Sequence, residues 1–131
     1  MIILDTCAIL WDALEPKKLT AKAKKQINAA DKACELLICD ISIWEISMLA
    51  SRKRIEIETS PSEFINLYLQ YRNIQVKSIT PEIAELSVNL GSEINNDPAD
   101  RLIAATSILT RAPIITADQN LRASGMLEII W

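Results

Sequence analysis

Short, predominantly apolar segments separated by longer helical patterns limit most strongly what this chain can fold into. Residues 1–4, 36–39, 113–116 and 127–131 are each dominated by large aliphatic side chains. Such runs, without alternation, are typical of strands buried on both faces, as strands are in parallel sheets. Residues 74–79 alternate between apolar and polar side chains and predict one more strand.

The segments between these strands carry helical signals. Ser60-Pro61 and Thr80-Pro81 each place a capping side chain directly before a proline, which is typical of a helix start. The predicted helices cover residues 6–14, 20–35, 42–54, 60–72, 80–94, 97–109 and 118–124. This alternation of strands and helices predicts a single α/β domain over residues 1–131, with a mainly parallel central sheet.

The composition excludes several kinds of site. The chain has no histidine, which excludes histidine-dependent catalysis and any zinc site that contains histidine. Only Gly91 and Gly125 are glycines, so no glycine-rich phosphate loop is possible. Cys7, Cys34 and Cys39 are odd in number and lack C-x-x-C spacing, so we expect no disulfide framework and a reducing cytoplasm.

The hydrophobic residues give no sign of a membrane protein. No run reaches the roughly eighteen apolar residues that a membrane helix needs. Asp5 interrupts the first apolar run, and no basic residue precedes it, which argues against a signal peptide. We therefore expect a cytoplasmic protein without membrane contact.

Acidic side chains follow several of the predicted strands. Asp5 ends the first strand, Glu45 lies in the first helical turn after the second, and Asp118 comes just after residues 113–116. The carboxyl ends of parallel strands meet at one edge of a sheet, so we expect these three acids to lie near one another. Asp100 lies in the first turn of a helix that follows no strand directly. Asp100 would join the other three acids if that helix points to the same edge of the sheet.

These acids also have a structural interpretation. Glu45 lies three residues after Ser42, which is the spacing of a capping box, and Asp118 suits an N-cap. Residues 60–63 repeat the same spacing without a preceding strand, so spacing alone does not separate capping from catalysis. Asp5 differs, because a carboxylate that closes a buried strand needs solvent, a partner or a metal ion.

The chemistry of four clustered carboxylates points to a metal ion. Mg²⁺ and Mn²⁺ prefer oxygen ligands and are often bound by carboxylates together with substrate phosphates. Such ions activate water and stabilise the leaving oxygen of a phosphodiester, and they relieve the repulsion between the acids. Asp40, which also ends a strand, and Asp97, three residues before Asp100, are further acids whose contribution stays open.

The motifs that carry these acids resemble those of the PIN domain family. Ile2–Cys7 resembles the first motif, Ser42–Ile46 the second, Asp97–Ala105 the third and Ile114–Asp118 the fourth. A short single-domain chain of this kind is similar to the VapC-type toxins of bacterial toxin–antitoxin pairs. The resemblance implies central parallel strands with helices on both faces of the sheet.

The resemblance also implies Mg²⁺- or Mn²⁺-dependent endonucleolytic cleavage of RNA. By motif, Asp5, Asp100 and Asp118 would be metal ligands, and Glu45 would bind the metal directly or through water. The supporting side chains near the acids would be Thr6, Ser42, Asp97 and Thr116. Many relatives carry a histidine shortly before the third motif, where this chain has Asn95 and Asn96. We expect that difference to affect local packing or substrate contact.

The partners implied by the resemblance are a second copy of the chain, in a homodimer, and a small antitoxin that lies in a groove and blocks the site. Aromatic side chains could line such a groove or could pack in the core; they are Trp11, Trp44, Phe64, Tyr68 and Tyr71. Basic residues 17–18, 22–25 and 52–54 could follow an RNA backbone or form solvated helix faces. The net charge of −3 argues mildly against nucleic-acid binding.

Two other kinds of function are possible for an α/β domain with these acids. A phospho-acceptor domain fits poorly, because a phosphatase of that type needs a second aspartate where Cys7 stands, and a receiver needs a lysine after a late strand. A catalytically inactive PIN-like module that binds protein or RNA stays the alternative, although all four acids are present.

Overall fold

The computed structural model describes residues 1–131 and contains a five-stranded sheet in the order β3-β2-β1-β4-β5. Every pair of neighbouring strands is parallel. The strands are β1 (Ile2–Leu4), β2 (Leu36–Cys39), β3 (Ile74–Lys77), β4 (Ile114–Ile115) and β5 (Ile129–Ile130). The predicted α/β fold is therefore confirmed, and the sheet is wholly parallel.

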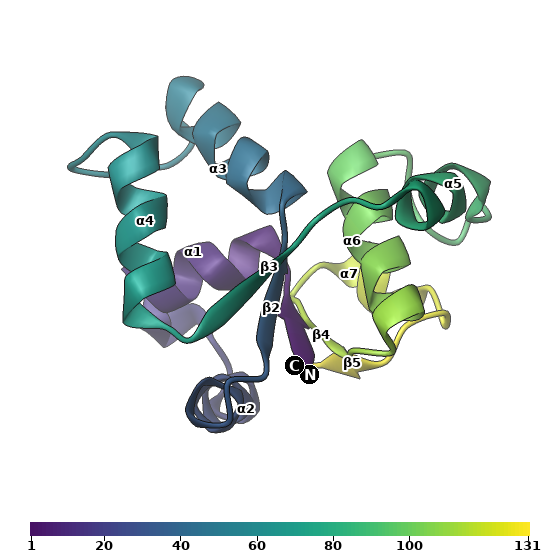
Figure 1. The fold of residues 1–131 in the computed structure, drawn as a ribbon, viewed down its shortest axis with the longest axis horizontal. Helices are drawn as coiled ribbons and strands as arrows, with labels where there is room; N and C mark the ends of the chain where they lie inside the picture. Colours follow the sequence, from purple (N-terminus) through teal and green to yellow (C-terminus); the bar gives the residue numbers. More distant parts are fainter.

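Seven α-helices surround this sheet (Figure 1). They are α1 (Thr6–Leu14), α2 (Ala21–Lys32), α3 (Ile41–Ser51), α4 (Pro61–Tyr71), α5 (Pro81–Asn89), α6 (Pro98–Thr110) and α7 (Gln119–Ala123), with a 3₁₀ turn at Pro16–Lys18. The hydroxyls of Thr20, Ser60 and Thr80 cap α2, α4 and α5 by accepting a backbone N–H in the first turn. None of the helices has the length and apolar character needed to cross a bilayer.

Alternate side chains of the strands face opposite layers of helices. Leu4, Leu36, Ile38 and Ile115 pack in one apolar cluster with residues of α1, α2 and α4. Ile3, Leu37, Cys39 and Ile114 pack on the other face, with Ile103 of α6. Both faces of the central strands are thus covered, which is why their sequences are wholly apolar.

The helix predicted for residues 80–94 ends earlier than expected. Helix α5 stops at Asn89 because Leu90 leaves the helical conformation, with a ψ of 142°. The Arg101 guanidinium then binds backbone carbonyls of this region, including those of Ser87 and Ile94. A distant arginine in α6 thereby satisfies carbonyl groups that a longer helix would have satisfied itself.

Candidate active site

One cavity at the carboxyl edge of the sheet contains all four predicted acids. It has a volume of about 420 Å³. Its lining residues are Asp5, Thr6, Cys7, Leu10, Trp11, Glu45, Leu49, Asp97, Asp100, Ala117 and Asp118. The sequence left the direction of α6 open, and in the structure α6 brings Asp100 to the same edge as the strand-end acids. None of the lining residues is basic.

Asp5 is held in one orientation by its neighbours. Its carboxylate is 5 % exposed and accepts the Thr6 backbone N–H at 2.7 Å on Oδ1 and the Thr116 hydroxyl at 2.6 Å on Oδ2. The Cys7 thiol lies 3.5 Å from the same Oδ2 atom. Burial raises the pKa of Asp5 above its usual range, while the hydrogen bonds from Thr116 and Thr6 act in the opposite direction.

Thr116 joins two of the acids. It donates its hydroxyl to Asp5, and the same oxygen accepts the backbone N–H of Asp118 at 3.0 Å. Asp118 in turn caps α7, because its Oδ1 atom accepts the Leu121 N–H at 2.9 Å. The capping interpretation of Asp118 is correct, and it is compatible with a place in the cavity, since the side chain caps α7 while lining the cavity.

Asp100 lies in the first turn of α6, and Asp97 caps that helix by accepting the Asp100 N–H at 3.1 Å. The pKa of Asp100 is raised to about 7, mainly by burial; the negative charges of Asp5, Asp97 and Asp118 contribute to the increase, and the hydrogen bond from Asn95 opposes it. The nearby carboxylates therefore repel one another in the absence of a cation.

Asn95 also belongs to the site, because it contacts Asp100, although its position in the sequence does not indicate this. Its side-chain amide donates to Asp100 Oδ2 at 2.9 Å. Its own backbone N–H donates to the Asn120 side-chain oxygen at 2.9 Å, which links the loop before α6 to α7. The only signal in the sequence is that Asn95 lies where many relatives carry a histidine. The spacing of residues along the chain does not predict its hydrogen bond to Asp100.

Glu45 is half-buried and lies on α3. Burial raises its pKa, and the charges of Asp5 and Asp97 add to that effect. The capping-box interpretation of Ser42 and Glu45 is wrong, because α3 begins at Ile41. The Ser42 hydroxyl instead lies 2.9 Å from the Thr6 hydroxyl and joins α3 to α1.

Asp40 lies at the end of β2 but does not line the cavity. Its Oδ2 atom accepts the Ile79 backbone N–H at 3.2 Å, so its side chain ties the segment after β3 to the end of β2. This leaves Asp97 as the additional acid of the cavity, where it lies exposed at the N-cap of α6.

The donor set suits a hard divalent cation. The acids supply oxygen ligands only, and no lysine or arginine in the lining compensates their charge. The carboxylates do not converge in this structure, since no three acidic or cysteine side chains form a group ready to hold an ion. The residues therefore fit a metal ion by the chemistry of their donor atoms.

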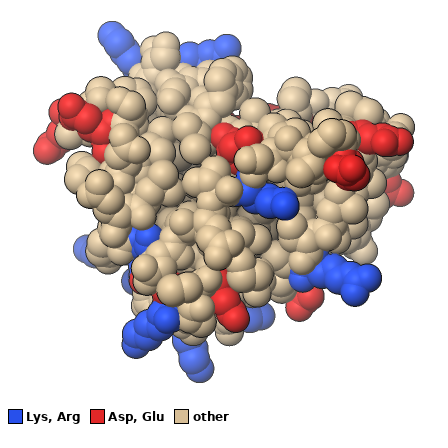
Figure 2. All heavy atoms as spheres, in the orientation of Figure 1, with Lys and Arg blue, Asp and Glu red and all other residues tan.

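The other aromatic and basic candidates lie outside this cavity, apart from Trp11. Tyr68 is buried and donates its hydroxyl to Asp12 at 2.7 Å, whereas Trp44 and Tyr71 are 58 % and 68 % exposed. Phe64 and Tyr71 line an apolar cavity of about 350 Å³ between α1 and α4. Figure 2 shows acidic and basic side chains scattered over one face, without a broad basic surface.

A parallel α/β sheet with carboxylates gathered at its carboxyl edge defines a class of small domains with an acidic site. The family model of the PIN domain matches residues 2–125, and the chain belongs to the PIN domain family. The family resemblance of the sequence motifs is thereby confirmed.

Within this family, the chain is similar to the following known proteins. The chain is 33 % identical to Ribonuclease VapC22 of Mycobacterium tuberculosis over 122 residues, which are 93 % of this chain and 90 % of that protein. Its fold is similar to a chain of the VapBC2 structure from Rickettsia felis bound to a promoter DNA fragment, with a TM-score of 0.74, 15 % identity and coverage of 98 % and 97 % of the two chains.

A toxin–antitoxin complex from Klebsiella pneumoniae gives a TM-score of 0.60 at 24 % identity, covering 90 % of this chain and 87 % of that one. DNA-bound VapBC from Salmonella typhimurium gives 0.70 at 15 % identity, covering 98 % and 97 %. At these identities the likeness to the three structures concerns the fold.

Proposed function

We propose that this chain is a VapC-type endoribonuclease that cleaves RNA phosphodiester bonds with Mg²⁺ or Mn²⁺ and acts as the toxin of a toxin–antitoxin pair. The observation that carries the proposal is the single cavity shared by Asp5, Glu45, Asp100 and Asp118, with no basic residue in its lining. The relative named Ribonuclease VapC22, which aligns over nearly the whole chain, supports the same activity.

Asp5, Asp100 and Asp118 would hold the metal ion. When bound, the ion would supply positive charge for the scissile phosphate and lower the pKa of a water molecule. Thr116 and the Thr6 backbone N–H keep Asp5 pointing into the cavity, and Asn95 does the same for Asp100. These contacts fix the orientation of Asp5 and of Asp100 within the cavity.

The proton of the attacking water needs an acceptor, and the chain has no histidine to provide one. Glu45 is the best candidate, because it is half-buried in the cavity and burial raises the pKa of its carboxylate. In this assignment Glu45 would accept the proton on a carboxylate oxygen, and Asp5, Asp100 and Asp118 would be the ionised side chains that hold the metal ion.

The test is cleavage of total RNA by the purified, antitoxin-free chain with Mg²⁺ or Mn²⁺. We expect discrete fragments that disappear with a chelator and in Asp5→Asn and Asp100→Asn. Asp40→Asn is a matched control, because Asp40 also follows a strand but lies outside the cavity. Activity that survives in both cavity variants would overturn the site, and a chain that neither cleaves RNA nor binds metal would favour the inactive binding module.

The proposed partners are a small antitoxin and a second copy of the chain. The structurally similar proteins from Rickettsia felis and Klebsiella pneumoniae are parts of toxin–antitoxin complexes. The apolar cavity between α1 and α4, with Leu67 and Tyr71 exposed at its rim, offers a surface for an antitoxin segment. Binding of the antitoxin should fall in Tyr71→Asp while the folded state is retained, and unchanged binding would place the antitoxin elsewhere.

A further inference from the structure

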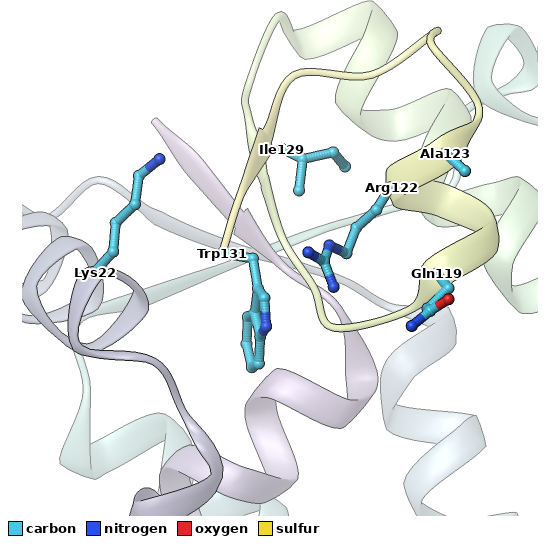
Figure 3. Close-up of a pocket in the computed structure, with 6 residues that line it drawn as sticks. All are labelled: Lys22, Gln119, Arg122, Ala123, Ile129 and Trp131. Atoms are coloured by element: carbon cyan, nitrogen blue, oxygen red, sulfur yellow. The ribbon is translucent and has the colours of Figure 1, made fainter.

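A second cavity, of about 510 Å³, lies between α2, α7 and β5 (Figure 3). Its lining residues are Lys22, Gln119, Arg122, Ala123, Ile129 and Trp131. Lys22 on α2 and Arg122 on α7 extend from opposite sides of this cavity, with Trp131 between them. Two cations, an aromatic ring and an amide thus share a space that the acidic site does not use.

This cationic cavity lies beside the acidic site at the same edge of the sheet. The strand register aligns Leu4 with Ile115, and Ile115 with Ile130. Asp5, Thr116 and Trp131 each come one residue later, so they follow three neighbouring parallel strands at the same level.

Two further observations show that the two cavities are neighbours. Gln119 of the cationic cavity directly follows Asp118 of the acidic one. The Trp131 ring lies 5.7 Å, centroid to centroid, from the ring of Trp11, which lines the acidic cavity.

The two cavities carry opposite charges: the one contains lysine and arginine side chains, and the other contains carboxylates. The acidic cavity has no cation, so by itself it repels the phosphates that flank a cleaved bond. Two other cations are engaged within the chain, since Arg72 pairs with Asp12 and Lys18 pairs with Glu15. Neither Lys22 nor Arg122 forms an ion pair within the chain, so both can neutralise phosphate.

We infer that the cationic cavity binds the nucleotides next to the cleaved bond of a single-stranded RNA. Lys22 and Arg122 contact the phosphates, and the Trp131 ring stacks on a base. Paired strands present no free base face to a side chain, so stacking selects the single strand. This inference rests on the proposed ribonuclease function and specifies how the substrate is held.

The first test measures the affinity of the full chain for a short, end-labelled, mixed-sequence single-stranded RNA, with a chelator present to prevent cleavage. Fluorescence anisotropy is recorded over a range of salt concentrations. Lys22→Gln and Arg122→Gln should each weaken binding several-fold and reduce the slope of log K against log salt by about 0.7. Lys24→Gln is the matched control, because Lys24 is an exposed lysine of α2 outside the cavity.

The second test examines the aromatic ring. Trp131→Leu should weaken RNA binding by roughly five- to hundredfold if a base stacks there, whereas Trp131→Phe should retain most of the affinity because it keeps an aromatic face. Thermal unfolding of each variant checks that the fold is intact. If the leucine variant does not fold, the two charge variants decide the inference alone.

Kinetics separate this inference from the proposed function. Substitutions in the cationic cavity should raise KM with kcat nearly unchanged, since they remove binding that substrate and transition state share. Wild-type cleavage with unaltered RNA affinity and KM in Lys22→Gln, Arg122→Gln and Trp131→Leu would overturn the RNA-binding role and leave the ribonuclease intact. A wild-type chain that neither binds nor cleaves RNA would overturn both.

Discussion

At the scale of single residues, the acidic site depends on side chains that carry no charge. Thr116 serves two acids with one hydroxyl, donating to Asp5 and accepting from the Asp118 backbone. Asn95 holds one oxygen of Asp100. Repulsion would otherwise turn these carboxylates toward solvent, so the neutral groups decide where the negative charge is presented.

Thr116→Val tests this arrangement, because valine keeps the shape of threonine and removes both hydrogen bonds. We expect the free energy of unfolding to fall by about 1–3 kcal/mol, since the buried Asp5 carboxylate and the Asp118 N–H lose their partner. Urea denaturation measures the change. Thr110→Val is the control, because the Thr110 hydroxyl bonds only to a carbonyl of its own helix, and an equal loss in both variants would contradict the special role of Thr116.

The raised pKa of Asp100 predicts a dependence of stability on pH in the metal-free chain. The folded state holds the proton up to about pH 7, whereas the unfolded state releases it near the usual value of 3.8. The folded chain therefore binds more protons between these values, and its stability should decrease as pH rises through this window. Thermal unfolding from pH 4 to pH 8 measures this decrease, and Asp100→Asn should make the curve flatter; an unchanged slope would refute the assignment.

At the scale of elements, a polar network fastens three helices that flank the sheet. Arg72 follows α4 and donates to both carboxylate oxygens of Asp12 in α1, at 2.8 and 3.0 Å. It also reaches Asp31 in α2 at 3.0 Å. Tyr68 donates to the same Asp12 carboxylate. The apolar cluster packs these helices, and the network fixes their relative position.

Arg72→Gln should be strongly destabilising, by about 3–5 kcal/mol, because it leaves the buried Asp12 carboxylate without its cation. The double variant Asp12→Asn with Arg72→Gln should lose less than the sum of the two single variants, since it leaves no unpaired buried charge. Urea unfolding of the four proteins gives the coupling. Strict additivity would mean that the ion pair contributes nothing beyond its separate groups.

At the scale of the whole molecule, parallel strands and crossing helices bring together acids that are far apart in sequence. Asp5 and Asp118 lie at opposite ends of the chain and join through neighbouring strands β1 and β4. Glu45 and Asp100 arrive on helices, so the cavity forms only when the complete domain has folded. Binding of a metal ion in this cavity would therefore be linked to folding, because the unfolded chain has no such site.

Mg²⁺ or Mn²⁺ should therefore raise the midpoint of thermal unfolding of the whole domain. At about a hundred times its Kd, an ion that binds only the folded state adds about 2.7 kcal/mol to the unfolding free energy. Differential scanning fluorimetry with and without metal measures the shift. Asp5→Asn should abolish most of it and Asp40→Asn should not, while an equal shift in both would place the ion outside the cavity.

The sequence by itself determined the strands, the parallel sheet and the order of the four acids. Short apolar runs between helical segments indicate buried strands, alternation indicates β3, and each acid lies in a motif that can be recognised along the chain. Tertiary structure alone decided the direction of α6, the contact of Asn95 with Asp100, the role of Ser42 and the meeting of Trp11 with Trp131. These depend on distances between elements, which packing sets and the spacing of residues along one chain does not encode.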